Sequence, residues 1–153
     1  MWAMSTETVL LDEPYALVWA DVSVPCIVVQ LRAFANRDQF KHMMNVGLAH
    51  YKAHSQPAHR WGWVADTRHM SAISQEVQQW LADDWNKQAF QAGLREMSIV
   101  SSANVLAQLA TQHYAHKAVE KAATYQLDPV YYGSLAEAQQ GAGQRCATLN
   151  ASR

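Results

Sequence analysis

Three short hydrophobic segments open the chain and predict β-strands. Residues 8–11 and 15–22 are apolar runs separated by residues 12–14, which include a proline. Because proline presets the backbone for a turn, this arrangement predicts an N-terminal hairpin. Residues 26–33 are β-branched and almost continuously hydrophobic, a pattern typical of a strand that is covered on both faces. We therefore expect this third strand to lie centrally in the sheet.

Two longer segments place their apolar residues at the helical period and predict amphipathic helices. The first covers residues 37–54, and Asn36 with Gln39 three positions later forms a capping-box pattern at its start. Its apolar stripe consists of Phe40, Met43, Met44, Gly47, Leu48 and Tyr51. The second covers residues 75–93 and is expected to end at its C-terminal glycine. The stripe predicted to be buried there consists of Val77, Trp80, Leu81, Trp85 and Ala92.

The remaining segments continue an alternation of strands and helices. Apolar residues 61–65 and 97–100 predict two further strands, and residues 105–123 predict a third helix. Residues 130–132 follow Pro129. Because a proline nitrogen cannot donate a hydrogen bond to a neighbouring strand, this segment is expected at a sheet edge.

The C-terminal part predicts a short helix and then a tail. Ser134 and Glu137 form a capping-box pattern for a helix over 135–140. From residue 141 onward Gly, Ala, Ser and polar residues dominate, which predicts a flexible tail over 141–153. The alternation predicts an α/β domain over residues 6–140, because parallel neighbours need a helix-length return path. We expect a single mixed sheet of about five strands with an N-terminal hairpin and three to four helices.

Composition and charge exclude several classes of protein. The chain of 153 residues is half hydrophobic, and its 12 basic and 13 acidic side chains give a net charge of −1. This balance is typical of one soluble globular domain rather than of a disordered chain. It lacks the basic excess of nucleic-acid-binding proteins, so we expect no nucleic-acid partner. The longest apolar run, residues 24–29, is far shorter than the roughly 20 residues that span a bilayer, so we expect no membrane span.

The N-terminus and the cysteines indicate a cytoplasmic location. No basic stretch followed by an apolar core opens the chain, as it would in a secretory signal. Cys26 and Cys146 lack the spacing of a zinc site or a redox motif, so two free thiols in a reducing compartment are expected. We therefore expect a cytoplasmic protein without a cofactor.

The segment from Asp66 to Leu81 resembles an uncharacterised bacterial branch of the STAS-like, SpoIIAA-like superfamily. The shared pattern is a strand, an Asp, a basic residue, a hydrophobe, an Ile-Ser turn and a helix that bears Trp. The similarity extends to an aromatic strand at Tyr131 and Tyr132, followed by Ser-Leu-x-Glu-Ala at residues 134–138. The resemblance covers about residues 15–140. It implies a compact αβ module that docks protein partners.

The same resemblance implies a regulatory site in the loop 66–74. In the anti-sigma-factor antagonists of the superfamily, a Ser or Thr at the N-terminus of the second helix is phosphorylated to switch partners. Ser71 and Ser74 occupy that turn here, although the family's Asp-Ser-Ser-Gly string is absent. From the residues alone, Ser74 is also explained as a plain helix N-cap.

Asp66, Arg68 and His69 form the best polar cluster in the chain. Asp66 ends a predicted strand, at the edge where open αβ sheets place functional groups. The alternative interpretation is that the Asp66 carboxylate only stabilises the turn after the strand.

The histidines form two pairs that each share a helix face, His50 with His54 and His113 with His116. No Glu accompanies either pair in a zinc motif, so we expect no metal site. His113 and His116 lie on the apolar side of their predicted helix, either in the core or a subunit interface or in contact with a metal or a ligand.

Large adaptable side chains allow an alternative site. The chain holds six Trp and six Met, and most of them are expected in the core because aromatic rings bury much surface. Some of them instead are candidates for the lining of a cavity that accepts an apolar ligand. The candidate lining residues are Trp61, Trp63, Trp80, Trp85, Met43 and Met44.

The sequence contains no nucleophile elbow, phosphate-binding glycine loop or glycosidase-like carboxylate pair, so we expect no enzyme. The leading hypothesis is a non-enzymatic regulatory or protein-interaction module that docks a protein partner through the loop 66–74. Phosphorylation of Ser71 or Ser74 is its candidate switch. The alternative is a carrier or sensor of a small apolar, lipid-like ligand. A homodimer is a reasonable expectation for either function.

Overall fold

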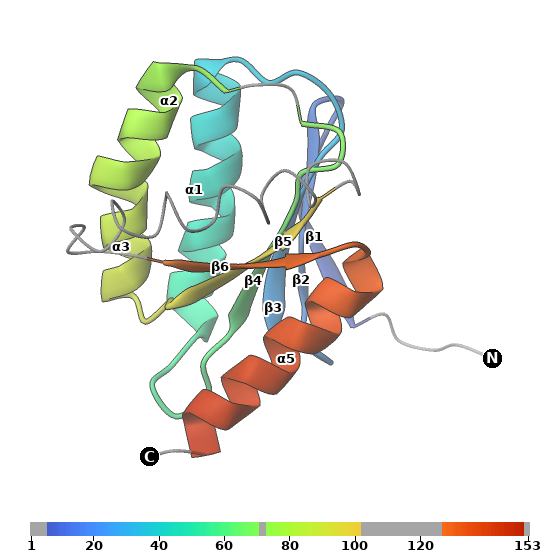
Figure 1. Cartoon of the computed structure of the whole chain (residues 1–153), viewed down its shortest axis with the longest axis vertical. Coiled ribbons are helices and arrows are strands. Elements are labelled where there is room, and N and C mark those ends of the chain that lie inside the picture. Colours follow the sequence, from blue (N-terminus) through green and yellow to red (C-terminus); the bar gives the residue numbers. More distant parts are fainter. Residues whose placement is uncertain (1–5, 71–72, 102–126, 152–153) are drawn as a thin grey trace.

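One mixed sheet organises the computed structural model, which describes residues 6–70, 73–101 and 127–151. Helices cover both faces of this sheet (Figure 1). Its strands, in spatial order, are β1 (Glu7–Glu13), β2 (Ala16–Asp21), β3 (Cys26–Leu31), β4 (Gly62–Asp66), β5 (Glu96–Val100) and β6 (Asp128–Tyr132). The α/β architecture with a mixed sheet is therefore confirmed, but the sheet has six strands rather than about five.

The hydrophobic pattern places the strands in the sheet as predicted. β1, β2 and β3 are antiparallel, which confirms the N-terminal hairpin, and β3 to β6 are parallel. β3 lies inside the sheet and is almost wholly buried, as its continuous hydrophobicity indicates. Pro129 lies on β6, which is an edge strand. The position of this proline is therefore also confirmed.

The first helix, α1 (Arg37–His54), follows its sequence pattern closely. The Asn36 side chain accepts a hydrogen bond from the Gln39 amide at 2.8 Å, and the Gln39 side chain accepts one from the Asn36 amide at 3.0 Å. This reciprocal pair is the predicted capping box. The buried residues of the helix are the predicted stripe of Phe40, Met43, Met44, Gly47, Leu48 and Tyr51.

The second predicted helix is divided by a wider turn. It consists of α2 (Gln75–Trp80), a π-helical turn over Leu81–Trp85, and α3 (Asn86–Gln91). The Asn86 amide donates to the Leu81 carbonyl, the five-residue bond of a π-helix. A regular helix would separate residues 77 and 85 by about 80° around its axis, and the wider turn brings both side chains to the core. The buried residues are Val77, Trp85 and Ala89, whereas Trp80, Leu81 and Ala92 are half-buried.

The C-terminal helix is longer than predicted. α5 (Leu135–Ala151) begins at the expected cap, where the Ser134 hydroxyl accepts from the Glu137 amide at 3.2 Å. It then continues through residues 141–151, which we had expected to be a flexible tail, so that prediction is wrong. The small residues of this segment allow close packing. A side chain at Gly62 of β4 would lie 3.0 Å from the Ala142 side chain, and one at Gly141 would overlap the Tyr132 ring.

Two apolar layers hold the sheet between the helices. One lies between the sheet and α1, α2 and α3, and the other lies between the sheet and α5. Cys26 is buried in the α5 layer as a free thiol. In the part of the chain that the structure describes, no helix combines the length and the apolar character needed to cross a membrane. The helix predicted over 105–123, with His113 and His116, lies outside the described residues.

Candidate functional site

The bend after β4 lies at the carboxyl edge of the parallel strands. Thr67 begins it and is fastened to β5, since its amide and its hydroxyl both donate to the Val100 carbonyl, at 2.9 and 2.8 Å. The Met70 amide then donates to the Thr67 carbonyl at 3.1 Å, which turns the chain back towards α2. The sequence analysis expected this loop at the edge where αβ sheets carry functional groups.

Asp66 holds the base of the bend from inside the molecule. Its carboxylate is fully buried and binds the Arg68 guanidinium through two hydrogen bonds, at 2.9 and 2.7 Å. The Gln30 side chain donates a third at 3.0 Å. Burial alone would raise the pKa of Asp66, but these hydrogen bonds and the Arg68 charge outweigh it and lower the pKa. Asp66 is therefore ionised and satisfied within the chain, as the turn-stabilising interpretation requires.

The outer part of the bend faces solvent. Arg68, His69 and Met70 are exposed, and the Met70 side chain is 38% accessible although it is hydrophobic. Ser74 is exposed too, and its hydroxyl accepts from the Val77 amide at 3.2 Å, which is a helix N-cap. Ser71 lies outside the described residues. The described part of the bend is therefore an accessible surface.

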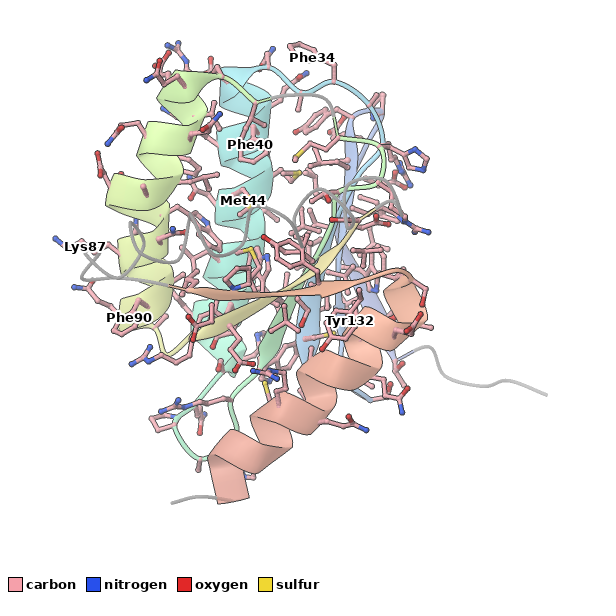
Figure 2. The ribbon with its side chains drawn as sticks, in the orientation of Figure 1. Phe34, Phe40, Met44, Lys87, Phe90 and Tyr132 are labelled. Carbon is pink, nitrogen blue, oxygen red and sulfur yellow. The ribbon has the colours of Figure 1, made fainter. Side chains whose placement is uncertain are left out.

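An apolar cavity lies under this bend, between the sheet and α1. Its volume is about 270 Å³, near the small end of ligand-binding pockets, which begin at roughly 300 Å³. Figure 2 shows Phe40 and Met44, two of its wall residues, one turn apart along α1. The full lining is Val29, Leu31, Phe40, Met43, Met44, Ala65, Thr67, Met70, Ile73, Leu81, Asn86, Met97, Ile99, Leu127 and Pro129. We call this space the methionine-rich cavity.

The chemistry of the methionine-rich cavity is uniform. Thr67 and Asn86 are the polar residues among those that line it, and the Thr67 hydroxyl is already bonded to β5. Four flexible methionines, Met43, Met44, Met70 and Met97, contribute to its wall. Because methionine side chains adapt to irregular shapes and apolar cavities do not hold water well, the space suits an apolar group.

The structure separates the residues that the sequence grouped as a pocket. Met43 and Met44 line the methionine-rich cavity, but the four tryptophans do not. Trp61 and Trp63 line a smaller pocket at the opposite edge of the sheet. Trp85 is a core residue whose indole N–H donates to the Met44 carbonyl at 3.2 Å. Trp80 is half-buried, with the Lys41 ammonium 5.5 Å above its ring.

Several cavity residues were absent from the sequence hypothesis. Met70 and Ile73 belong to the bend. Met97 belongs to β5, Pro129 belongs to β6, and Leu127 directly precedes β6. Each is an ordinary apolar residue in a short segment, so no local pattern sets it apart. The sequence offers one signal, for Met70 and Ile73, which are large apolar residues in a mostly polar loop.

The other polar candidates do not gather into a chemical centre. His50 and His54 stack on each other with their ring centroids 3.9 Å apart, and the His54 ring nitrogen bonds the His50 carbonyl at 3.0 Å. Among residues 6–70, 73–101 and 127–151, no three His, Cys, Asp or Glu side chains lie together as a metal site would require. His113 and His116 lie outside this set.

The site therefore combines an accessible bend with an apolar cavity beneath it. Comparison of the chain with protein-family models, with curated proteins and with solved structures finds no match.

Proposed function

We propose that this protein is a non-enzymatic binding domain that holds a small apolar ligand in the methionine-rich cavity. The observation that carries the proposal is the lining, in which thirteen of fifteen residues are apolar. Burial of each ligand methylene contributes about 0.8 kcal/mol, so a chain of a few carbons gains useful affinity without any hydrogen bond. The function is that of a carrier or sensor.

The bend supplies an entrance with mixed character. Met70 lines the cavity and is also 38% exposed, so it lies between the apolar interior and solvent. Arg68 and His69 precede it on the exposed surface. A ligand with an apolar tail and a polar end fits this order, because the tail enters the cavity and the polar end stays beside the exposed residues.

The proposal is tested with N-phenyl-1-naphthylamine, a neutral dye that becomes fluorescent in apolar surroundings. We expect saturable fluorescence with the purified protein, and displacement by straight-chain alcohols with an optimum chain length. Ala65→Leu, which fills part of the cavity, is expected to weaken dye binding at least about tenfold while the protein stays folded, since cavity filling is commonly tolerated.

A matched pair of charge substitutions controls for surface effects. Met70→Asp places a carboxylate at the cavity entrance and should weaken dye binding. Val22→Asp makes the same change of charge at another exposed apolar residue, which is 59% accessible and is not among the residues that line the cavity, and should leave dye binding unchanged. Equal dye binding by the wild-type protein and by the Ala65→Leu and Met70→Asp variants would contradict the proposal.

A second candidate function is a protein-interaction module switched by phosphorylation. The exposed Ser74 hydroxyl favours it, because a kinase can reach this group. Arg37 extends from α1 to Glu76 at 3.0 Å, so a guanidinium is available near the start of α2 to pair with a phosphate. The resemblance to the STAS-like superfamily supports the same function and a protein partner.

Native mass spectrometry of protein purified from its own host distinguishes the two functions. A bound mass that organic solvent removes supports the ligand carrier. A phosphate mass that phosphatase removes, and that is absent from Ser74→Ala, supports the switch. A clean unmodified mass, with no partner recovered with the protein and no dye binding, argues against both.

A further inference from the structure

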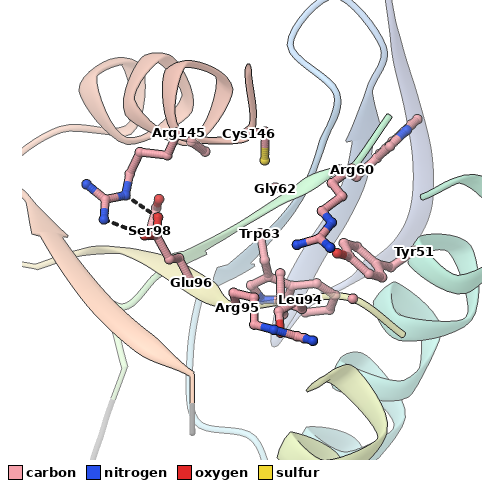
Figure 3. A pocket seen from close by; sticks show the side chains of 13 residues that line it. Tyr51, Arg60, Gly62, Trp63, Leu94, Arg95, Glu96, Ser98, Arg145 and Cys146 are labelled. Carbon is pink, nitrogen blue, oxygen red and sulfur yellow. Dashed lines mark hydrogen bonds and ion pairs between the residues drawn. The ribbon is translucent and has the colours of Figure 1, made fainter. Parts of the chain in front are cut away.

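A second pocket lies at the opposite edge of the sheet, where β4 and β5 begin (Figure 3). Tyr51 borders it from the last turn of α1, and Arg60 borders it from the segment that leads into β4. Arg95 and Glu96 border it from the start of β5, and Arg145 borders it from α5. Residues that are distant in the sequence therefore converge on one small space.

The lining of this pocket carries an excess of positive charge. Three arginines and one glutamate line it, and Arg145 and Glu96 form an ion pair with each other (Figure 3). Arg95 is fixed in place, since its guanidinium lies 3.6 Å from the centre of the Phe90 ring and donates to the Leu94 carbonyl at 3.0 Å. Burial lowers the pKa of Arg95, and so does the positive charge of Arg60. The pocket therefore holds two guanidinium groups that repel each other.

An unsatisfied donor faces the same space. The Tyr51 side chain is fully buried, and among the described residues its hydroxyl has no hydrogen-bond partner. Burial raises the pKa of Tyr51, whereas the positive charges of Arg60 and Arg95 act in the opposite direction. Figure 3 shows the Tyr51 hydroxyl directed towards the Arg60 guanidinium. A buried hydroxyl without a partner is rare in folded proteins, and here it lies beside cations that cannot accept its proton.

We propose that this pocket is a binding site for a small oxyanion, of the phosphate or carboxylate class. Such a group accepts hydrogen bonds from the Tyr51 hydroxyl and from the guanidiniums of Arg60 and Arg95, and it reduces the repulsion between the two arginines. The enclosed space is about 20 Å³, and a water-sized group needs roughly 10–15 Å³. One oxygen of the anion therefore enters, and the rest of the anion, or of a molecule that bears it, lies at the mouth.

The experiment is isothermal titration with inorganic phosphate at constant ionic strength, with chloride as the reference salt. Acetate and glycerol phosphate are titrated in parallel. Saturable binding of phosphate and glycerol phosphate identifies a phosphate group as the ligand, free or as an ester, and saturable binding of acetate alone identifies a carboxylate. The proposal is overturned if neither phosphate, glycerol phosphate nor acetate binds more tightly than chloride.

Tyr51→Phe is the informative variant, because it removes the hydroxyl and little else. We expect its phosphate affinity to fall about tenfold, as is typical when a hydrogen bond to a charged group is lost. Without phosphate its unfolding midpoint should not fall, because among the described residues the hydroxyl has no hydrogen-bond partner to lose. If the hydroxyl instead had a structural role, Tyr51→Phe would have a lower unfolding midpoint and an unchanged affinity for phosphate.

Two arginine variants complete the test. Arg60→Gln removes a charge from the pocket and is expected to weaken phosphate binding about tenfold or more. Arg32→Gln removes a charge that is paired with Asp12 elsewhere on the surface, and should leave the affinity unchanged. Equal affinities for wild-type, Tyr51→Phe and Arg60→Gln would place any bound phosphate elsewhere and refute this site. The proposal is independent of the ligand in the methionine-rich cavity, because no residue lines both spaces.

Discussion

Asp66 carries a buried negative charge whose partners come from β3 and from the bend. Asp66→Asn removes this charge and keeps the size of the side chain. We expect the free energy of unfolding to fall by about 2 kcal/mol, less than the roughly 3–5 kcal/mol for breaking a fully buried pair, because the Arg68 side chain is 37% exposed. Urea denaturation measures this change. An unchanged free energy of unfolding would show that the ion pair does not stabilise the bend.

The same carboxylate predicts a dependence of stability on pH. The pKa of Asp66 is lower in the folded protein than its ordinary value of 3.8. Its stabilising contribution is therefore present above about pH 3.8 and is lost as the pH falls through the folded pKa. We expect the stability difference between the wild-type protein and Asp66→Asn to be full at pH 7 and to shrink below pH 3.8. A difference that stays constant over this range would contradict the assignment.

Gly47 shows how one missing side chain determines packing at the residue scale. A Cβ atom at this position would lie 2.6 Å from the Trp63 ring and 3.2 Å from Ile27. The Trp63 ring cannot retreat easily, since it is fully buried and packs edge-on against Trp85 at 4.9 Å between centroids. This position therefore requires a glycine despite its cost in a helix.

Gly47→Ala is therefore expected to destabilise the protein by about 1–2 kcal/mol, because overpacking outweighs the gain in helix propensity. Gly133→Ala is the matched control, since nothing lies within 4 Å of a Cβ atom there, and it should change the free energy of unfolding by less than about 0.5 kcal/mol. Thermal and urea unfolding measure both variants. A Gly47→Ala protein as stable as the wild type would mean that the Trp63 ring moves freely.

At the scale of elements, α1 illustrates a helix whose start is determined locally. Asn36→Ala removes the capping-box bond that the Gln39 amide donates to the Asn36 side chain and is expected to cost about 1 kcal/mol. Asn45→Ala makes the same substitution at an exposed position inside the helix, where it should be neutral or stabilise by up to about 0.5 kcal/mol. Urea denaturation measures the free energy of unfolding of both variants. If the cap acts as described, this free energy falls for Asn36→Ala and does not fall for Asn45→Ala.

At the scale of the whole molecule, stability depends on helices that cover both faces of the sheet. α5 alone among the described helices packs on the second face, where Ala138 and Ala142 contact the layer that contains Val28 and Val64. Residues 141–146 therefore belong to the folded unit and not to a flexible tail.

This placement predicts a strong contrast between two substitutions on α5. Ala142→Glu forces a carboxylate into a position that is only 4% exposed, and the expected loss is more than about 2 kcal/mol. Gln140→Glu introduces the same residue on the exposed side of the helix and should have an effect below about 0.5 kcal/mol. If residues 141–146 formed a loose tail, both variants would unfold like the wild type, and calorimetry would show it.

The whole molecule also separates its two proposed binding sites. The methionine-rich cavity lies below the bend at the carboxyl ends of β4 and β5, and the arginine-lined pocket lies at their amino ends. Strands β4 and β5 lie between them, and no residue lines both spaces. The two sets of variants can therefore be measured independently.

The sequence by itself determined the elements whose signals are local. The hairpin, the buried β3, the edge position of Pro129 and the capped stripe of α1 follow from turn chemistry, periodicity and caps, which act over a few residues. The tertiary structure decided the rest. Glycines at 141 and 143 predict a loose segment by propensity, but contact with the sheet stabilises a helix there. The π-helical turn, the methionine-rich cavity and the convergence of Tyr51 with Arg60 and Arg95 depend on packing between distant segments, and no short-range pattern in the chain encodes such contacts.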